Sequence, residues 1–198
     1  MDVSTIITLA IIAGLVFWAV GIYNQLVALK NRYKNAFAQI EVQLKRRYDL
    51  IPNLVETAKG YLDHERETLQ AVTEARDAAA SVLAEAARDP GNAQAIQGLV
   101  SQEGVLQGAL SRFNIAVEAY PDLKANENMM QLTEELTTTE NKIAFARQAF
   151  NDQIMAYNTY RQSFPNVVLA PTFGHPTDAE LLEFEDSEAI QEAPSVSF

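Results

Sequence analysis

The feature that most constrains this chain is an apolar run near its N-terminus. Residues 3–22 read VSTIITLAIIAGLVFWAVGI and contain no charged side chain. Twenty residues of α-helix rise about 30 Å, which matches the hydrocarbon core of a bilayer. Trp18 and Tyr23 lie toward the far end of the run, where aromatic rings favour the membrane interface. The run therefore predicts a transmembrane helix over residues 1–23.

Positive charge gathers after this run, and its distribution predicts the topology. We call these cations the basic collar: Lys30, Arg32, Lys34, Lys45, Arg46 and Arg47. Cations beside a span stay in the cytoplasm, so we expect the N-terminus outside and the bulk of the chain inside. No Lys or Arg precedes the run, which argues against a cleaved signal peptide. The collar either sets topology alone or also binds anionic lipid headgroups, at about 1 kcal/mol per well-placed residue.

Length and composition bound the rest of the molecule. The chain has 198 residues, which suits one span plus one modest domain. It has no cysteine, and therefore neither a disulfide framework nor a thiolate metal site. The formal net charge is −11, and the residues beyond Ile51 are predominantly acidic. Because phosphate binding needs a positive surface, nucleic acid is not an expected partner.

Beyond the span, apolar side chains recur at steps of three and four, which is typical of amphipathic helices. The fold class is therefore all-α: a long antiparallel helical bundle of three or four helices over residues 24–166. The helices expected after the span cover residues 23–50, 53–88, 93–120 and 127–163. A proline and glycine turn at residues 89–92 separates two of them, and Asn126 is expected to cap the last.

Pro52 decides how many helices the bundle has. An interior proline removes one backbone hydrogen bond and either ends a helix or kinks it. If it ends the helix, four helices alternate in direction and residues 167–173 return to the Tyr23 end. If the helix only bends and continues to Arg88, three helices remain, and residues 167–173 lie far from the bilayer.

The last part of the chain, residues 167–198, has a different character. A short apolar segment is interrupted by a proline, and residues 174–198 then carry seven acidic side chains and no Lys or Arg. This tail lacks a periodic apolar face, so we expect it to be disordered or loosely docked.

Catalytic and metal-binding patterns are not found in the sequence. The two histidines, His64 and His175, lack the second histidine or the paired Glu-x-x-His spacing that zinc and di-iron sites require. We expect both to be surface or interfacial side chains. Serine and cysteine hydrolase motifs and phosphate-binding loops are also missing. No catalytic residue, cofactor or metal is predicted, and the chain is not expected to be an enzyme.

One motif is unusual for a solvated helix. Residues 45–54 read KRRYDLIPNL, in which a basic triplet and a carboxylate precede the helix-interrupting proline. The proline frees backbone carbonyls near residue 48, and Arg46, Asp49 and Asn53 can pair either with these groups or with a neighbouring helix. The motif is either a kink stabilised by a salt bridge or a hinge or oligomer contact. The candidate interaction residues are Lys45, Arg46, Arg47, Asp49, Pro52 and Asn53.

Several motifs of this sequence resemble the LemA family of bacterial membrane proteins. The longest covers residues 23–57 and includes NAFAQIEVQLKRRYDLIPNLVET; the others include YPDLKAN at residues 120–126, TENKIA at residues 139–144 and FPN at residues 164–166. The resemblance extends over about residues 20–173, and the tail departs from the family pattern. It implies a helical-bundle domain on the cytoplasmic side of a bacterial inner membrane, behind one N-terminal span, and it implies no enzymatic activity.

These observations lead to one expected function and one alternative. We expect a non-enzymatic, membrane-anchored scaffold or adaptor that self-associates, as a homo-oligomer, or recruits partners at the cytoplasmic membrane face. The alternative is an accessory regulatory subunit of a membrane protease or envelope-stress system, which would have an obligate partner other than itself.

Overall fold

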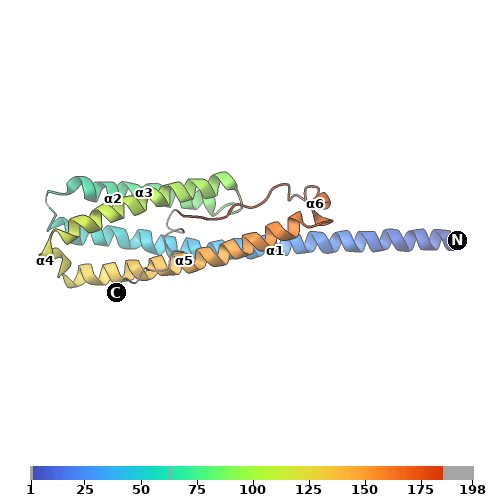
Figure 1. Ribbon diagram of the computed structural model, residues 1–198, viewed down its shortest axis with the longest axis horizontal. Helices are drawn as coiled ribbons and strands as arrows, with labels where there is room; N and C mark the ends of the chain where they lie inside the picture. The colour runs from blue at the N-terminus through green and yellow to red at the C-terminus, as the bar shows by residue number, and fades with distance from the viewer. Residues whose placement is uncertain (1, 63, 185–198) are drawn as a thin grey trace, which may run out of the picture.

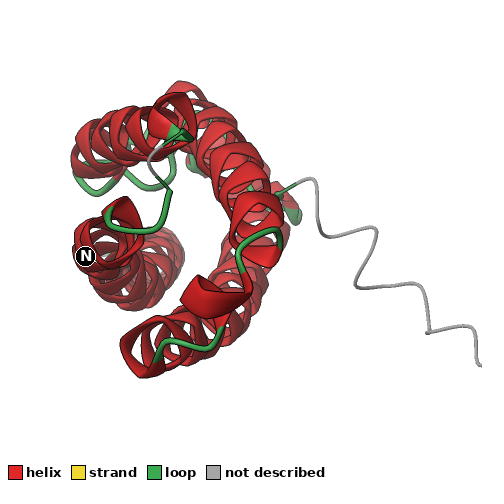
Figure 2. Ribbon diagram, turned by 90° about the vertical axis from the view of Figure 1, so that its left-hand side faces the viewer, coloured by secondary structure: helices red, strands yellow, loops and turns green. Residues whose placement is uncertain are grey.

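The computed structural model describes residues 2–62 and 64–184, and this part of the chain is all-α, without strands. Its helices are α1 (Val3–Lys59), α2 (Arg66–Ala86), α3 (Ala93–Glu118), α4 (Pro121–Lys124), α5 (Glu127–Gln162) and α6 (Asn166–Leu169). Four long helices alternate in direction and lie roughly parallel to one common axis (Figures 1 and 2). The expected antiparallel bundle is thus confirmed, in its four-helix form.

The first helix is continuous from the apolar run into the bundle. α1 passes through Pro52 and ends at Lys59, so the expected boundary at Pro52 is wrong. The chain breaks instead between Gly60 and Glu65, where Leu62 is fully buried beneath the turn. The helix ends before Gly60 because glycine has low helix propensity. Burial of the Leu62 side chain then holds the turn in place.

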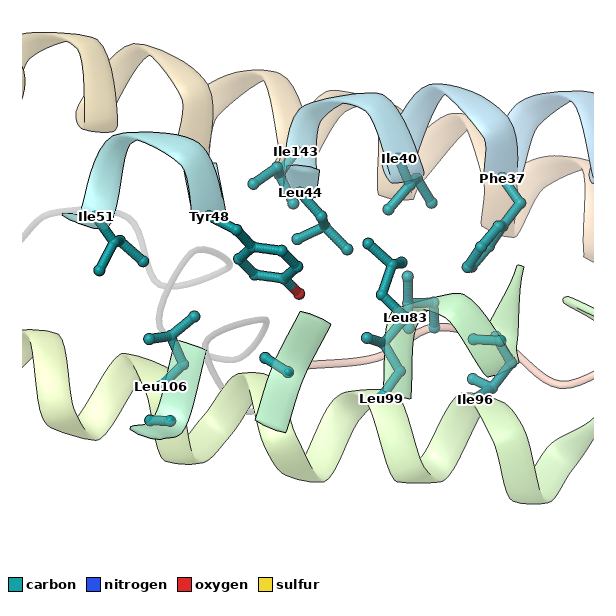
Figure 3. Close-up of a cluster of buried hydrophobic side chains, with 14 of the residues drawn as sticks. Phe37, Ile40, Leu44, Tyr48, Ile51, Leu83, Ile96, Leu99, Leu106 and Ile143 are labelled. Atoms are coloured by element: carbon teal, nitrogen blue, oxygen red, sulfur yellow. The ribbon is translucent and has the colours of Figure 1, made fainter. Parts of the chain in front are cut away.

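The bundle consists of two helix pairs that share a core. α1 packs most extensively against α5, and α2 packs against α3. Figure 3 shows side chains of all four helices meeting in the interior between them. The stripes expected from periodicity supply this core, which includes Leu26, Phe37, Ile40, Leu44, Leu99, Phe113, Phe150 and Ile154.

The turns follow the expected sequence signals. Asn92 and Asn126 cap α3 and α5, because their side-chain oxygens accept hydrogen bonds from the amides of Ala95 and Met129 at 3.0 and 3.1 Å. Gly91 lies close to Tyr33, and an added Cβ would come within 2.7 Å of the tyrosine hydroxyl. A glycine is therefore required at this turn.

After α5 the chain returns to the end of the bundle nearest the apolar run. The Phe173 ring packs edge-on against Tyr23 of α1, with ring centroids 5.6 Å apart. The return expected for a four-helix bundle is therefore confirmed, although the break that produces it lies after Lys59.

Residues 175–184, which we call the strap, run from this end back along the bundle in an extended conformation. The strap is packed, with Ala179 and Leu182 buried. The expectation of a disordered or loosely docked tail is thus wrong for these residues, because α5 supplies polar partners for their backbone, as described below. Residues 185–198, which the same expectation covered, lie outside the described residues.

The apolar N-terminal part of α1 extends beyond the other helices (Figure 1). Its large side chains are exposed, among them Phe17 at 80% and Leu15 at 57%, whereas Ile22 and Leu26 are buried in the bundle. In length and composition, α1 meets the requirements for crossing a membrane.

Candidate functional site

The predicted interaction motif lies near the middle of the bundle, and its residues face different surroundings. Lys45 is exposed and pairs with Glu41 one turn earlier, at 2.6 Å. Arg46 reaches toward Glu135 of α5, with 3.9 Å between the charged groups. Asp49, Pro52 and Asn53 are exposed as well. The motif is therefore divided between a solvated surface and, at Arg47, the interior.

Arg47 enters the core and forms an ion pair with Glu103 of α3. Both side chains are more than nine-tenths buried. The Tyr48 hydroxyl donates a hydrogen bond to the second carboxylate oxygen of Glu103. Figure 3 shows this tyrosine directed from α1 toward the α2–α3 pair. Burial raises the pKa of Tyr48 to about 12, despite the nearby guanidinium groups of Arg47 and Arg76, so its hydroxyl stays protonated. These contacts tie α1 to α3.

Pro52 explains a second contact of the motif. Because proline has no N–H, the carbonyl of Tyr48 loses its helical partner. Arg76 of α2 supplies a replacement, with its Nε donating to that carbonyl at 3.0 Å. The same guanidinium lies 4.0 Å from Asp49. A residue of a neighbouring helix, and not one of the motif residues that the sequence suggested, thus caps the freed carbonyl and lets the helix continue.

Two residues of this site, Arg76 and Glu103, were not among those predicted. Glu103 could have been found, because it occupies the position between Leu99 and Leu106 where the buried stripe of α3 requires an apolar side chain. A carboxylate at such a position needs a buried partner. Arg76 had no comparable signal, since it lies on a partly exposed face 28 residues from the carbonyl that it caps.

A groove of about 800 Å³ lies over the Arg47–Glu103 pair, and we call it the α3–α5 groove. One wall is α3, where an added Cβ at Gly104 or Gly108 would meet nothing within 4 Å. Glu140, Ile143, Ala144 and Arg147 of α5 form the opposite wall, and Phe184 of the strap also lines the groove. The Arg147 guanidinium lies over the Phe184 ring, 4.8 Å from its centroid.

Polar side chains of α5 hold the strap through its backbone. Asn158 both donates to and accepts from the main chain of Ala179, at 2.8 and 2.9 Å. Asn151 makes the same two contacts with Leu182, at 3.1 and 2.9 Å. Such pairs recognise an extended backbone independently of its side chains.

Arg161 fixes the beginning of the strap. Its guanidinium donates to the carbonyl oxygens of His175 and Pro176, at 3.1 and 2.5 Å, and to the carboxylate of Asp178 at 2.6 Å. Three acceptors around one guanidinium orient the chain where it leaves the turn after α6.

The two histidines differ in their surroundings. His64 is exposed, as expected. His175 is buried where the strap meets α5, which is the interfacial and not the surface alternative; its Nδ1 lies 2.9 Å from the Tyr157 hydroxyl. Burial lowers the pKa of His175, and the cations Lys30 and Arg161 act in the same direction. Within the described residues, no three His, Cys, Asp or Glu side chains are grouped to hold a metal ion.

The continuity of α1 separates the basic collar into two groups. Lys30 and Lys34 lie 8 and 12 residues beyond Ile22, or about 12 and 18 Å along the helix axis. Lys45 lies 23 residues beyond Ile22, or about 35 Å. At physiological salt, with a Debye length of about 8 Å, a charge at this distance is screened far more strongly from a membrane surface beside Ile22 than the first group is.

Comparison with known proteins agrees with this architecture. A model of the LemA family matches residues 36–198. The match continues through the acidic tail, so the expectation that the resemblance stops at residue 173 is wrong. The chain is also 28% identical over 148 residues to Protein LemA of Metamycoplasma hominis, and the alignment covers 75% of this chain and 63% of that protein. A helical bundle behind one long apolar helix, matched by this family over most of its length, makes the chain a member of the LemA family.

Proposed function

We propose that this LemA-family chain is a non-enzymatic, membrane-anchored scaffold or adaptor. Its apolar N-terminal segment spans the bacterial inner membrane, its bundle lies in the cytoplasm, and it self-associates or recruits partners there. The observation that carries the proposal is the exposed apolar N-terminal part of α1, which is joined to the bundle without a break. Such a large exposed apolar surface needs a cover, which a bilayer supplies.

The end of the bundle nearest this segment supports an arrangement in which it faces the membrane. Phe164, Val167 and Val168 are exposed there, at 85%, 42% and 65%. Tyr23 and Phe173 meet at the same end. Apolar and aromatic side chains favour the interfacial region of a bilayer, so this surface suits contact with the headgroup layer.

The interior of the bundle supports a structural role. The buried ion pair of Arg47 with Glu103 and the bond from Arg76 to the Tyr48 carbonyl both connect one helix to another. A helical framework of this kind offers surfaces for binding.

Membrane anchoring is tested with a charge in the centre of the span. Ile12→Lys places an ammonium group at mid-bilayer, at a cost of about 3 kcal/mol on the insertion scale. We expect the double variant, Ile11→Lys with Ile12→Lys, to be lost from the membrane fraction that resists carbonate extraction. Val42→Lys, at an exposed position on the same helix inside the bundle, should remain membrane-bound. Equal fractionation of the two variants would contradict the anchor.

Topology and assembly need separate measurements. The chain has no native cysteine, so Ser187→Cys can be probed alone. In intact cells it should resist membrane-impermeant thiol reagents, and ready labelling would place the bundle outside. Light scattering of the detergent-purified chain should give a homomer or a complex with another protein. A monomer without a co-purifying partner would contradict the scaffold.

A further inference from the structure

We propose that the end of the bundle nearest the apolar run is a binding surface for anionic phospholipids, formed by an uncharged loop and three cations of α1. The loop covers residues 162–174, from the end of α5 through α6, and we call it the end loop. The cations are Lys30, Arg32 and Lys34. This inference rests on the proposed membrane anchor, to which it adds a lipid class and a second membrane contact.

The composition of the end loop suits an apolar surrounding. Its sequence, QSFPNVVLAPTFG, contains no ionisable side chain, although 21% of the residues of the whole chain are charged. Charged side chains are costly to remove from water, and uncharged ones much less so. The loop can therefore be transferred to the surface of a bilayer without burying a charge.

Within the end loop the usual burial of apolar and polar side chains is reversed. Asn166 is buried, and its side-chain amide donates to the Tyr160 carbonyl at 2.8 Å. Phe164 and Val168 are exposed instead, at 85% and 65%. Neighbouring apolar side chains that are exposed in this way mark an interaction surface.

The position of the end loop indicates what covers this surface. Phe173 packs against Tyr23, which directly follows the apolar run. Figure 1 shows α6 at the same level along the long axis, where α1 leaves the bundle. A bilayer that receives residues 3–22 would therefore begin at the height of the end loop. Lipid is thus the partner that this position favours.

The three cations of α1 at this end have no carboxylate partner. None of Lys30, Arg32 and Lys34 forms an ion pair with another described residue, whereas each of the other three cations of the basic collar pairs with a glutamate. Lys30 lies about 12 Å beyond Ile22 along the helix axis, and the headgroup layer extends about 5–8 Å from the hydrocarbon core. The long side chain of Lys30 can therefore extend to the headgroups.

The carboxylates near this end are balanced by other cations. Asp178, the first carboxylate after the end loop, pairs with Arg161 at 2.6 Å. Asp89, in the turn before α3, directly follows Arg88. This end therefore keeps the positive charge of the three cations of α1, although the formal net charge of the chain is −11. A cationic surface beside exposed apolar side chains favours anionic over zwitterionic headgroups.

A spin label on Thr172→Cys in the full-length chain tests the contact, because Thr172 is an exposed position of the end loop and the chain has no native cysteine. The labelled chain is reconstituted into vesicles of phosphatidylcholine, alone or with one-third phosphatidylglycerol. Phosphatidylglycerol should lower the collisions of this label with a neutral, water-soluble nickel chelate at least about threefold. A label on Ser81→Cys, exposed on α2, should show no change. Accessibility of the Thr172 label that does not depend on phosphatidylglycerol would overturn the proposal.

The role of the cations is tested with two triple variants that remove the same charge. One replaces the cations of this end: Lys30→Gln, Arg32→Gln and Lys34→Gln. The control replaces exposed lysines elsewhere: Lys45→Gln, Lys59→Gln and Lys124→Gln. Breaking the two exposed ion pairs of the control costs little stability. The effect of phosphatidylglycerol should be lost in the first variant and kept in the control, and any other pattern would overturn the role of these cations.

The role of the apolar side chains is tested in the same vesicles. Phe164→Ser with Val168→Ser changes the end loop, and Phe145→Ser with Met155→Ser changes two exposed apolar positions of α5 as a control. All four side chains are exposed, so neither double variant is expected to unfold the bundle. Collisions of the Thr172 label with the chelate should rise several-fold in the first variant and stay unchanged in the control. Equal collisions in both would overturn the contact of the end loop with lipid.

Failure of the anchor and failure of this surface give different results. The accessibility of the Thr172 label is measured first, and the vesicles are then washed with carbonate. A chain that is shielded at Thr172 but removed by carbonate would contradict the anchor and support the surface. A retained chain whose label stays accessible would contradict the surface alone. Spin–spin broadening between labels without shielding by lipid would show a second copy at this end, and would also overturn the proposal.

Discussion

Arg47 and Glu103 bring opposite charges into the interior between α1 and α3. Removing one partner of a buried ion pair exposes the other to an apolar interior without compensation. Such a pair is therefore costly to break even where it adds little net stability.

We expect Glu103→Gln to lower the free energy of unfolding by about 3 kcal/mol, the lower end of the range for a buried pair. The lower end applies because the carboxylate of Glu140, which lines the same groove as Arg47, can partly offset the loss of the Glu103 charge. Glu41→Gln, which breaks the exposed Lys45–Glu41 pair, should change it by less than about 0.5 kcal/mol. Thermal unfolding followed by circular dichroism compares the two. If both variants lost the same free energy of unfolding, the buried pair would matter no more to stability than the exposed one.

His175 should make strap docking sensitive to pH. Its pKa is lowered in the folded chain from the ordinary value of 6.5, by burial and then by Lys30 and Arg161. The unfolded or undocked state therefore binds a proton more readily, and the stability that depends on neutral His175 is fully present above about pH 6.5. That stability is lost as the pH falls through the lowered value.

The check compares the wild-type chain with His175→Gln. Between about pH 7 and pH 5 the wild type should lose more protection of the strap amides against hydrogen exchange than the variant does, because glutamine does not titrate. A parallel loss in both chains would assign the pH dependence to other groups.

At the scale of elements, Pro52 and Arg76 act as a unit. The guanidinium bonds to a carbonyl that the proline has left without a helical donor. In the wild-type background, Arg76→Met should cost about 1–2 kcal/mol, because a buried carbonyl loses its partner. In a Pro52→Ala background the restored amide reaches the same carbonyl, and the cost should fall below about 1 kcal/mol. Additive effects in this cycle would show that the two residues act independently.

The strap depends on the two asparagines that bind its backbone. Asn158→Ala and Asn151→Ala each remove two hydrogen bonds, so each should weaken docking by about 1–3 kcal/mol. Hydrogen exchange at Ala179 and Leu182 reports the loss directly. Ser111→Ala removes a hydroxyl that donates to the Gln107 carbonyl within α3; this variant serves as the control and should leave both amides protected. Unaltered protection in the asparagine variants would mean that apolar burial alone holds the strap.

Sequence periodicity predicted the helices well, because each presents a continuous apolar face to one core. It failed where a distant residue changes the local outcome. Pro52 predicts a break only if the Tyr48 carbonyl stays unpaired, and Arg76 pairs with it from another helix. The strap has no periodic face, and partners on α5 order it through its main chain. The sequence analysis did not predict that Arg47 is buried, because that burial depends on a pair with Glu103 on a helix 56 residues away.

At the scale of the whole molecule, the end near Tyr23 should touch the headgroup layer. We expect a fluorophore on Val168→Cys to be quenched by lipid-attached quenchers when the chain is reconstituted into vesicles. The same fluorophore on Ile115→Cys, also exposed but near the C-terminal end of α3 at the other end of the bundle, should not be quenched. Similar quenching at both sites would mean that the bundle lies flat on the membrane.

The unbroken course of α1 gives the molecule the mechanics of a lever. From Ile22 to Lys59 the helix extends about 55 Å, and no joint separates this arm from the apolar segment. A span changes its inclination when the surrounding bilayer becomes thinner or thicker. If the inclination of this span changes by about 10°, the far end of the arm sweeps sideways by roughly 10 Å, given its length. If the apolar segment spans a membrane as we propose, a small deformation of the lipid thus becomes a displacement of the Gly60 turn that is large compared with the side chains of a neighbouring protein.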